Sequence, residues 1–154
     1  MQFNAPHWRS GYMPLIIGGI GAMGSALLMP WVVVASPITG ALSRTGIQLR
    51  DGRLFAVGLL ALALVAWSEA RAPRASTRTV LLVGLVLLGV AGAVEYRDVT
   101  RLVAGFNDDG AAARVGFGIF AMGLGLTFSV AGVLKRRIAL QPAEEEAEAE
   151  QFAA

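Results

Sequence analysis

Residues 115–134 read VGFGIFAMGLGLTFSVAGVL, and this run of 20 residues contains no Asp, Glu, Lys, Arg or His. A helix needs about 20 mostly apolar residues to cross the ~30 Å hydrocarbon core of a bilayer. No water is available there to bond the backbone, and a helix satisfies its own N–H and C=O groups within the segment. The run therefore predicts a transmembrane helix.

Three further apolar stretches precede this run, and none of them contains an ionisable residue: Met13–Ala35, Leu54–Trp67 and Thr79–Val94. The shorter two reach a workable length once their flanking residues are included. We predict an all-α integral membrane protein, a four-transmembrane-helix bundle. Its spans lie at about residues 13–35, 54–70, 79–95 and 115–134, within one domain at residues 1–137. Arg9 before the first span also fits a signal peptide, but Pro30 and Trp31 occupy the positions where small residues are expected before a cleavage site, so we expect this span to be retained.

Composition supports the same protein class. Apolar residues make up 55% of the 154 residues and charged residues only 16%, less than in a typical soluble domain. Cysteine is absent, which excludes disulfides, thiolate metal sites and cysteine nucleophiles. The net charge of +2 comes from arginines at the span ends rather than along one face, so we expect the lipid bilayer and not nucleic acid as the partner.

The distribution of basic residues predicts the orientation in a cell (plasma or inner) membrane. Seven basic residues lie on the side of the termini and six on the other side, where acids accompany them. The positive-inside rule therefore favours cytoplasmic N- and C-termini. Aromatic and basic side chains at the span ends are expected to anchor the bundle at the membrane interfaces. These residues are Trp8, Tyr12, Trp31, Trp67, Tyr96, Lys135, Arg136 and Arg137.

Small residues recur at a spacing of four on three of the spans. In a membrane such residues let helices approach closely, and close packing is what joins the helices. The stripes either hold the four helices of one chain together or, most of all on the fourth span, face another subunit. The predicted packing residues are Gly18, Ala22, Ala26, Gly89, Ala93, Gly118, Ala121, Gly125 and Ser129.

The two longer connections carry patterns of their own. Ile47 and Leu49 alternate with polar residues, which predicts a small β-hairpin-like outer loop that covers the bundle as a lid. Val99, Leu102, Val103 and Phe106 recur at helical spacing, which predicts a short amphipathic outer helix lying in the interface. Residues 107–110, Asn-Asp-Asp-Gly, then form a solvated turn rather than a calcium loop, because the alternating ligands of an EF-hand are missing.

The chain after the fourth span is acidic. Pro142 is expected to end the helix, and glutamates alternate with alanines from Glu144 to Glu150. A block of like charge with almost no apolar content cannot form a core. Residues 138–154 are therefore predicted to be a disordered cytoplasmic tail, either solubilising or docking a basic partner.

Few residues offer chemistry. His7 is the only histidine and cannot build a metal site alone, so we predict no metal, no cofactor and no enzyme activity. No ionisable residue lies at mid-depth, where only Ser25, Thr127 and Ser129 are polar, so an ion-coupled transporter is disfavoured. Glu69 and Glu95 lie at span ends, where their carboxylates are expected to reach water.

The sequence resembles a group of small four-span membrane proteins of actinobacterial (high-GC bacterial) type. The likeness rests on Pro30-Trp31, on Asp51-Gly52-Arg53 and on residues 115–118, Val-Gly-Phe-Gly. It implies no assigned activity. Trp31 before an outer loop is also similar to claudin-type tetraspan proteins, but the paired loop cysteines of that family are missing, so that comparison is not adopted.

The leading functional hypothesis is a non-catalytic accessory or scaffold subunit that docks against other membrane protein subunits or against copies of itself. Its motivation is the surplus of small-residue stripes without any embedded reactive group. One alternative is permeation of ions or small solutes through an oligomer lined by Ser25, Thr127 or Ser129. The other is a membrane sensor whose outer loops bind a ligand.

Overall fold

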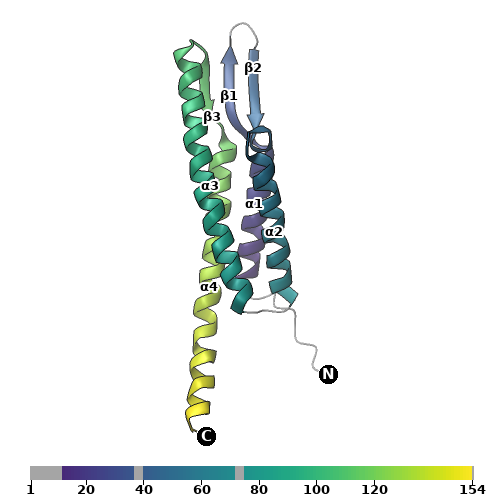
Figure 1. Ribbon diagram of the computed structural model, residues 1–154, viewed down its shortest axis with the longest axis vertical. Helices are drawn as coiled ribbons and strands as arrows, with labels where there is room; N and C mark the ends of the chain where they lie inside the picture. The colour runs from purple at the N-terminus through teal and green to yellow at the C-terminus, as the bar shows by residue number, and fades with distance from the viewer. Residues whose placement is uncertain (1–11, 37–39, 72–74, 154) are drawn as a thin grey trace.

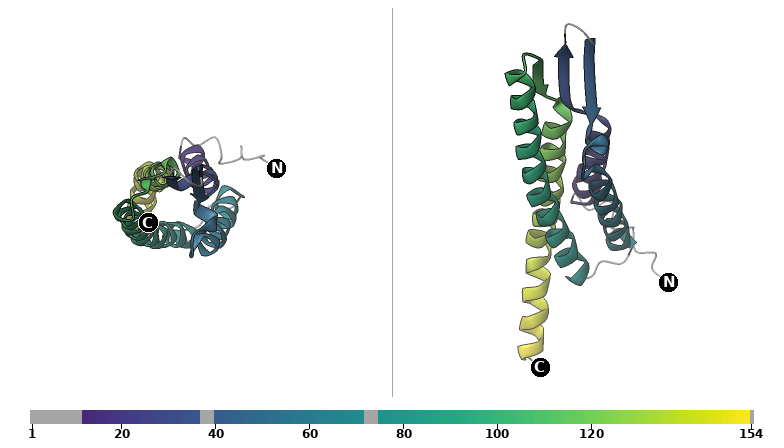
Figure 2. Two further views of the ribbon diagram at one scale, coloured as in Figure 1. Left: turned by 90° about the horizontal axis from the view of Figure 1, so that it is seen from above. Right: turned by 45° about the horizontal axis from the view of Figure 1, so that its top comes forward.

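The computed structural model describes residues 12–36, 40–71 and 75–153, which are mostly helical (Figure 1). The helices are α1 (Met13–Leu28), α2 (Gly52–Arg71), α3 (Ala75–Asp108) and α4 (Phe117–Ala153), and a short 3₁₀ helix, η2, spans Gly46–Gln48. The strands are β1 (Pro30–Ser36), β2 (Gly40–Thr45) and β3 (Ala112–Val115). The four helices run side by side, and the strands extend from one end of the bundle, called the sheet end below (Figures 1 and 2).

Three of the helices are long and apolar enough to cross a membrane: Gly52–Arg71, Ser76–Asp108 and Phe117–Lys135. Large apolar side chains cover their outer surfaces; Leu64 of α2 and Leu87 of α3 are both 63% exposed. Such a surface is compatible with contact to lipid. The first predicted span is different, because α1 has only 16 residues and is about 24 Å long at ~1.5 Å per residue.

The first predicted span, residues 13–35, is wrong in its last third. The chain leaves α1 at Met29, whose φ of −82° and ψ of 157° are extended, and continues as strand β1. Pro30 disfavours helical geometry at the residue before it and has no N–H to donate. Trp31 and three valines follow, and aromatic and β-branched residues favour strands. An apolar run of this length fits a buried strand as well as a helix end.

The strands form a three-stranded antiparallel sheet in the order β2-β1-β3. The central strand pairs Val33 with Ser43 on one side and with Arg114 on the other. A small sheet is present at this end, but its hairpin is formed by β1, which lies within the predicted first span, and by β2; the strand expected over residues 47–50 is wrong. Ile47 and Gln48 belong to η2 instead. There the Gln48 side chain accepts a hydrogen bond from the Thr45 backbone N–H at 3.1 Å, which stabilises a turn of the chain.

The separate amphipathic outer helix is also wrong, because its residues are the last turns of α3. The helical spacing itself is correct: Val99 is buried and Val103 packs against the core, whereas Leu102 and Phe106 are exposed. No proline separates the segment from the preceding span, so the helix continues to Asp108. The predicted turn follows, with Gly110 at a φ of +81°.

Helix α4 continues through Pro142 to Ala153, whereas the sequence analysis places its end at this proline. The segment after Pro142 consists largely of alanine and glutamate, which have high helix propensity. That propensity favours helix on both sides of the proline.

Candidate functional site

The glycine-rich face of α4 lies against α1, and this pair makes the most extensive contacts between helices. A Cβ atom on Gly125 would lie 2.7 Å from both the Gly19 carbonyl oxygen and Met23 Cγ. Ser129 is fully buried between the two helices, and its hydroxyl donates to the Ile16 carbonyl at 3.4 Å. We call this interface the α1–α4 seam. Two of the predicted packing residues, Gly125 and Ser129, thus pack between helices of the same chain and not against another subunit.

The predicted stripe on α1 does not stay on one face. Ala26 is buried, Ala22 is half-buried, and Gly18 is exposed with no atom within 4 Å of a Cβ built on it. Each step of four residues rotates the position by about 40° around a helix with ~3.6 residues per turn. The stripe therefore turns from the outer surface into the bundle. The α1 glycine that packs in the seam is Gly19, which is not part of the predicted stripe of every fourth residue.

The remaining predicted packing residues also contact neighbours within the chain. A Cβ atom on Gly118 would lie 2.5 Å from Trp31 Cδ1, and one on Gly89 would lie 3.1 Å from Leu126 Cδ2. Ala121 is half-buried and packs against the core. Ala93 is exposed and lines a small cavity of about 180 Å³ between α3 and α4.

Trp31, one of the predicted interface anchors, is buried in the core of the chain. It is 1% exposed, and its Nε1–H donates to the Ala26 carbonyl at 2.8 Å. Its ring packs edge-on against Phe55 at a centroid distance of 6.3 Å. A Cβ atom on Gly46 would approach the ring to 2.6 Å. Trp31 thus joins α1, β1, η2, α2 and α4 at the sheet end.

The other predicted anchors are placed more variably. Tyr12 is buried, whereas Trp67 and Tyr96 are about half exposed, at 48% and 46%. The Arg71 guanidinium lies 5.0 Å from the centroid of the Trp67 ring, a cation–π geometry. Lys135 is exposed, the backbone of Arg136 and Arg137 lies in α4, and Trp8 lies outside the described residues.

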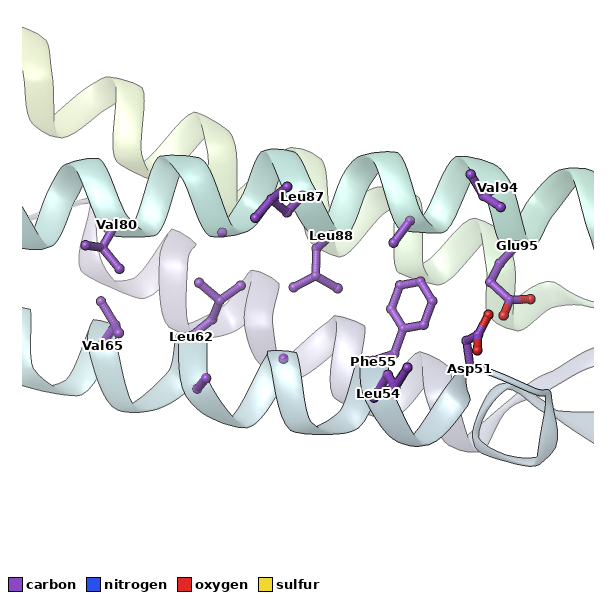
Figure 3. Close-up of a pocket in the computed structure, with 14 residues that line it drawn as sticks. Asp51, Leu54, Phe55, Leu62, Val65, Val80, Leu87, Leu88, Val94 and Glu95 are labelled. Atoms are coloured by element: carbon purple, nitrogen blue, oxygen red, sulfur yellow. The ribbon is translucent and has the colours of Figure 1, made fainter.

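An open groove of about 640 Å³ lies between α2 and α3. Figure 3 shows side chains from both helices facing this space, among them Leu62 and Val65 of α2 opposite Val80 and Leu87 of α3. Gly58 also lines the groove, and no atom lies within 4 Å of a Cβ built on it. We call this feature the α2–α3 groove.

Two carboxylates close the α2–α3 groove at the sheet end, Asp51 just before α2 and Glu95 of α3 (Figure 3). Glu95 is only 8% exposed, and the Asp51 backbone N–H interacts with its carboxylate. The charged groups that act on Glu95 are Asp51 and Asp98, which are both acidic. The expectation that Glu95 reaches bulk water is therefore wrong, and so is the same expectation for Glu69, which is 1% exposed.

The α2–α3 groove is not among the features predicted from the sequence. Its walls are ordinary leucines and valines, residue types that also occur on any buried or lipid-facing helix surface. The signals that mark it are Gly58 and Gly84, small residues on facing helices, together with an acid at the end of each helix segment. Comparison of the chain with known protein families, curated proteins and solved structures finds no match.

Proposed function

We propose that this chain is a non-catalytic integral membrane protein that acts as an accessory or scaffold subunit. The observation that carries the proposal is the outer face of α1, defined by Gly18, Gly21 and Ser25. All three residues are exposed, and no atom lies within 4 Å of a Cβ built on either glycine. We call this surface the α1 outer face.

The outer surfaces of the other helices consist mostly of larger side chains, although single glycines such as Gly123 of α4 are also exposed there. Leu64 of α2, Val90 of α3 and Phe128 of α4 present large side chains, which pack well against lipid tails. Glycine and serine instead let the backbone of another helix approach closely, and that close packing drives association in a bilayer. We infer that the α1 outer face receives a helix of another membrane subunit or of a second copy of this chain.

The length of α1 supports the same proposal. A helix of about 24 Å is shorter than the ~30 Å hydrocarbon core. A short span is accommodated by local thinning of the bilayer or by association with other helices. Docking of a longer helix against α1 would cover its outer face and shield its ends.

The permeation alternative has less support from the packing. Ser129 is buried in the α1–α4 seam, and the Thr127 hydroxyl donates to the Gly123 carbonyl of its own helix at 2.9 Å. Of the three polar residues expected to line an oligomeric pore, only Ser25 is exposed without such a bond in the described chain. Ser25 belongs to the α1 outer face, where a docked helix would cover it.

The test combines purification with a matched pair of variants. The protein is extracted from its native membrane in a mild detergent, and the masses of the intact assemblies are measured by native mass spectrometry. We expect an assembly larger than one chain that is lost in the double variant Gly18→Leu, Gly21→Leu. Gly58→Leu places the same side chain on α2 and is expected to leave the assembly intact.

Two results would contradict this proposal. One is a lone monomer for the unaltered chain in every detergent, with no assembly after cross-linking in the membrane. The other is equal loss of the assembly in the α1 double variant and in Gly58→Leu, because the effect would then not be specific to the α1 outer face.

A further inference from the structure

The α2–α3 groove combines apolar walls with a charged end, and the accessory-subunit proposal uses neither. Its volume of about 640 Å³ lies within the ~300–1,000 Å³ typical of small-molecule sites. Leu54 and Leu87 on its walls are 71% and 63% exposed, so the groove is open along its length to whatever surrounds the helices. A ligand dissolved in the bilayer can enter from the side.

The side chains at the sheet end of the α2–α3 groove are acidic. Glu95 is more than nine-tenths buried and lines the groove, and Asp51 faces it from the start of α2 (Figure 3). The charges acting on Glu95 come from Asp51 and Asp98, and no arginine or lysine of the described chain forms an ion pair with Glu95. A buried carboxylate without a counter-charge loses solvation, and a cation that reaches it gains a strong, weakly screened interaction.

We propose that the α2–α3 groove binds a small lipophilic cation, a molecule with an apolar body and one ammonium-like or phosphonium-like charge. The apolar body lies between Leu62 and Leu87, and the charge lies beside Glu95 and Asp51. A hydrated metal ion would gain nothing from the apolar walls. A neutral lipid chain would fill the walls but leave the two carboxylates without a counter-charge.

The Asp51 backbone supports the role of Glu95 as the charge that recognises the ligand. Asp51 lies immediately before α2, where the positive end of the helix dipole favours a negative charge. The Asp51 backbone N–H interacts with the Glu95 carboxylate and so helps to hold it in place. The sheet end of the groove therefore places two carboxyl groups side by side before any ligand arrives.

The experiment uses the full chain in nanodiscs of phosphatidylcholine, whose zwitterionic surface attracts neither sign of charge. The probe is radiolabelled tetraphenylphosphonium, and its competitor is tetraphenylborate, an anion of nearly the same shape. We expect saturable binding of the cation that the anion does not displace. Glu95→Gln should weaken binding by about tenfold or more, because it removes a charge-assisted contact.

Matched variants separate the site from the fold. Asp98→Asn removes a neighbouring acid that does not line the groove, and it should change affinity less than Glu95→Gln. Gly58→Leu fills the groove without changing its charge and should abolish binding, whereas Gly18→Leu on α1 should not. Each variant is first shown to be monodisperse and to have a thermal midpoint near that of the unaltered protein.

Three results would overturn the proposal. The first is the absence of saturable binding to the unaltered chain. The second is equal binding of tetraphenylborate, which would mean that the groove takes any apolar body, such as a lipid chain. The third is unchanged affinity in a folded Glu95→Gln variant, and none of these outcomes depends on whether the α1 outer face docks another subunit.

Discussion

At the scale of single residues, the α1–α4 seam leaves no room for a methyl group at Gly125. A Cβ atom there would lie 2.7 Å from the Gly19 carbonyl oxygen and 2.9 Å from the Met23 backbone nitrogen. Backbone atoms cannot move aside cheaply, so Gly125→Ala is expected to destabilise the protein by about 1–3 kcal/mol, a typical cost of overpacking. Thermal unfolding in detergent, followed by circular dichroism, measures the change.

The control for that prediction is two residues away on the same helix. No atom lies within 4 Å of a Cβ built on Gly123. Gly123→Ala should therefore be neutral or stabilising, since alanine has the higher helix propensity. Equal loss of stability in both variants would contradict the assignment of Gly125 to the seam.

Trp31 supports a second prediction at this scale. Trp31→Phe removes the indole N–H that donates to the Ala26 carbonyl at 2.8 Å and leaves space beside Gly46 and Gly118. Loss of a buried hydrogen bond together with packing volume should cost about 1–3 kcal/mol. Trp67→Phe makes the same change at a half-exposed position and should cost less than about 1 kcal/mol. The two thermal midpoints, measured in the same detergent, test this difference directly.

At the scale of elements, the sequence predicts helices better than it predicts where they end. Apolar runs without ionisable residues located the three long helices, because no water is needed to satisfy a helix backbone. Strand β1 was not predicted, because the apolar residues from Trp31 to Val34 fit a buried strand and a helix equally well. Val99 and Val103 were placed on the correct helical face, but nothing in their spacing says whether α3 continues or breaks before them.

Asn107 supports a prediction about β3. Its side-chain oxygen accepts from the Ala113 N–H at 2.7 Å, and its amide donates to the Ala113 carbonyl at 3.2 Å, so it caps the edge of the strand that faces away from β1. Asn107→Ala should therefore increase hydrogen exchange at the Ala113 amide, as measured by mass spectrometry. Asn107→Asp keeps the acceptor and should preserve most of that protection. Unchanged exchange in the alanine variant would show that β1 alone holds β3.

At the scale of the whole molecule, composition is compatible with apolar surroundings but does not predict the geometry of the α2–α3 groove. Beside the groove Leu62 of α2 packs against Gly84 of α3, and glycines in the seam draw α1 and α4 together. Stripes of small residues indicate which helices are able to approach closely, and the rotation of each stripe decides which ones do. Gly18 and Gly19 are adjacent in sequence, yet one faces outward and the other packs in the seam. That difference depends on the packing of whole helices and is not readable from spacing alone.

Orientation in the membrane is the last prediction, and the chain is well suited to test it. Arg71, Arg78 and Lys135 lie at the end of the bundle opposite the sheet, so the positive-inside rule places the sheet end outside the cytoplasm. Because the sequence has no cysteine, each introduced cysteine is the only thiol. In intact cells a membrane-impermeant maleimide should label Ser43→Cys in exposed β2, and it should label Ser76→Cys at the start of α3 only after the membrane is permeabilised. The reverse pattern would place the termini outside, and the α2–α3 groove would then open its acidic end toward the cytoplasm.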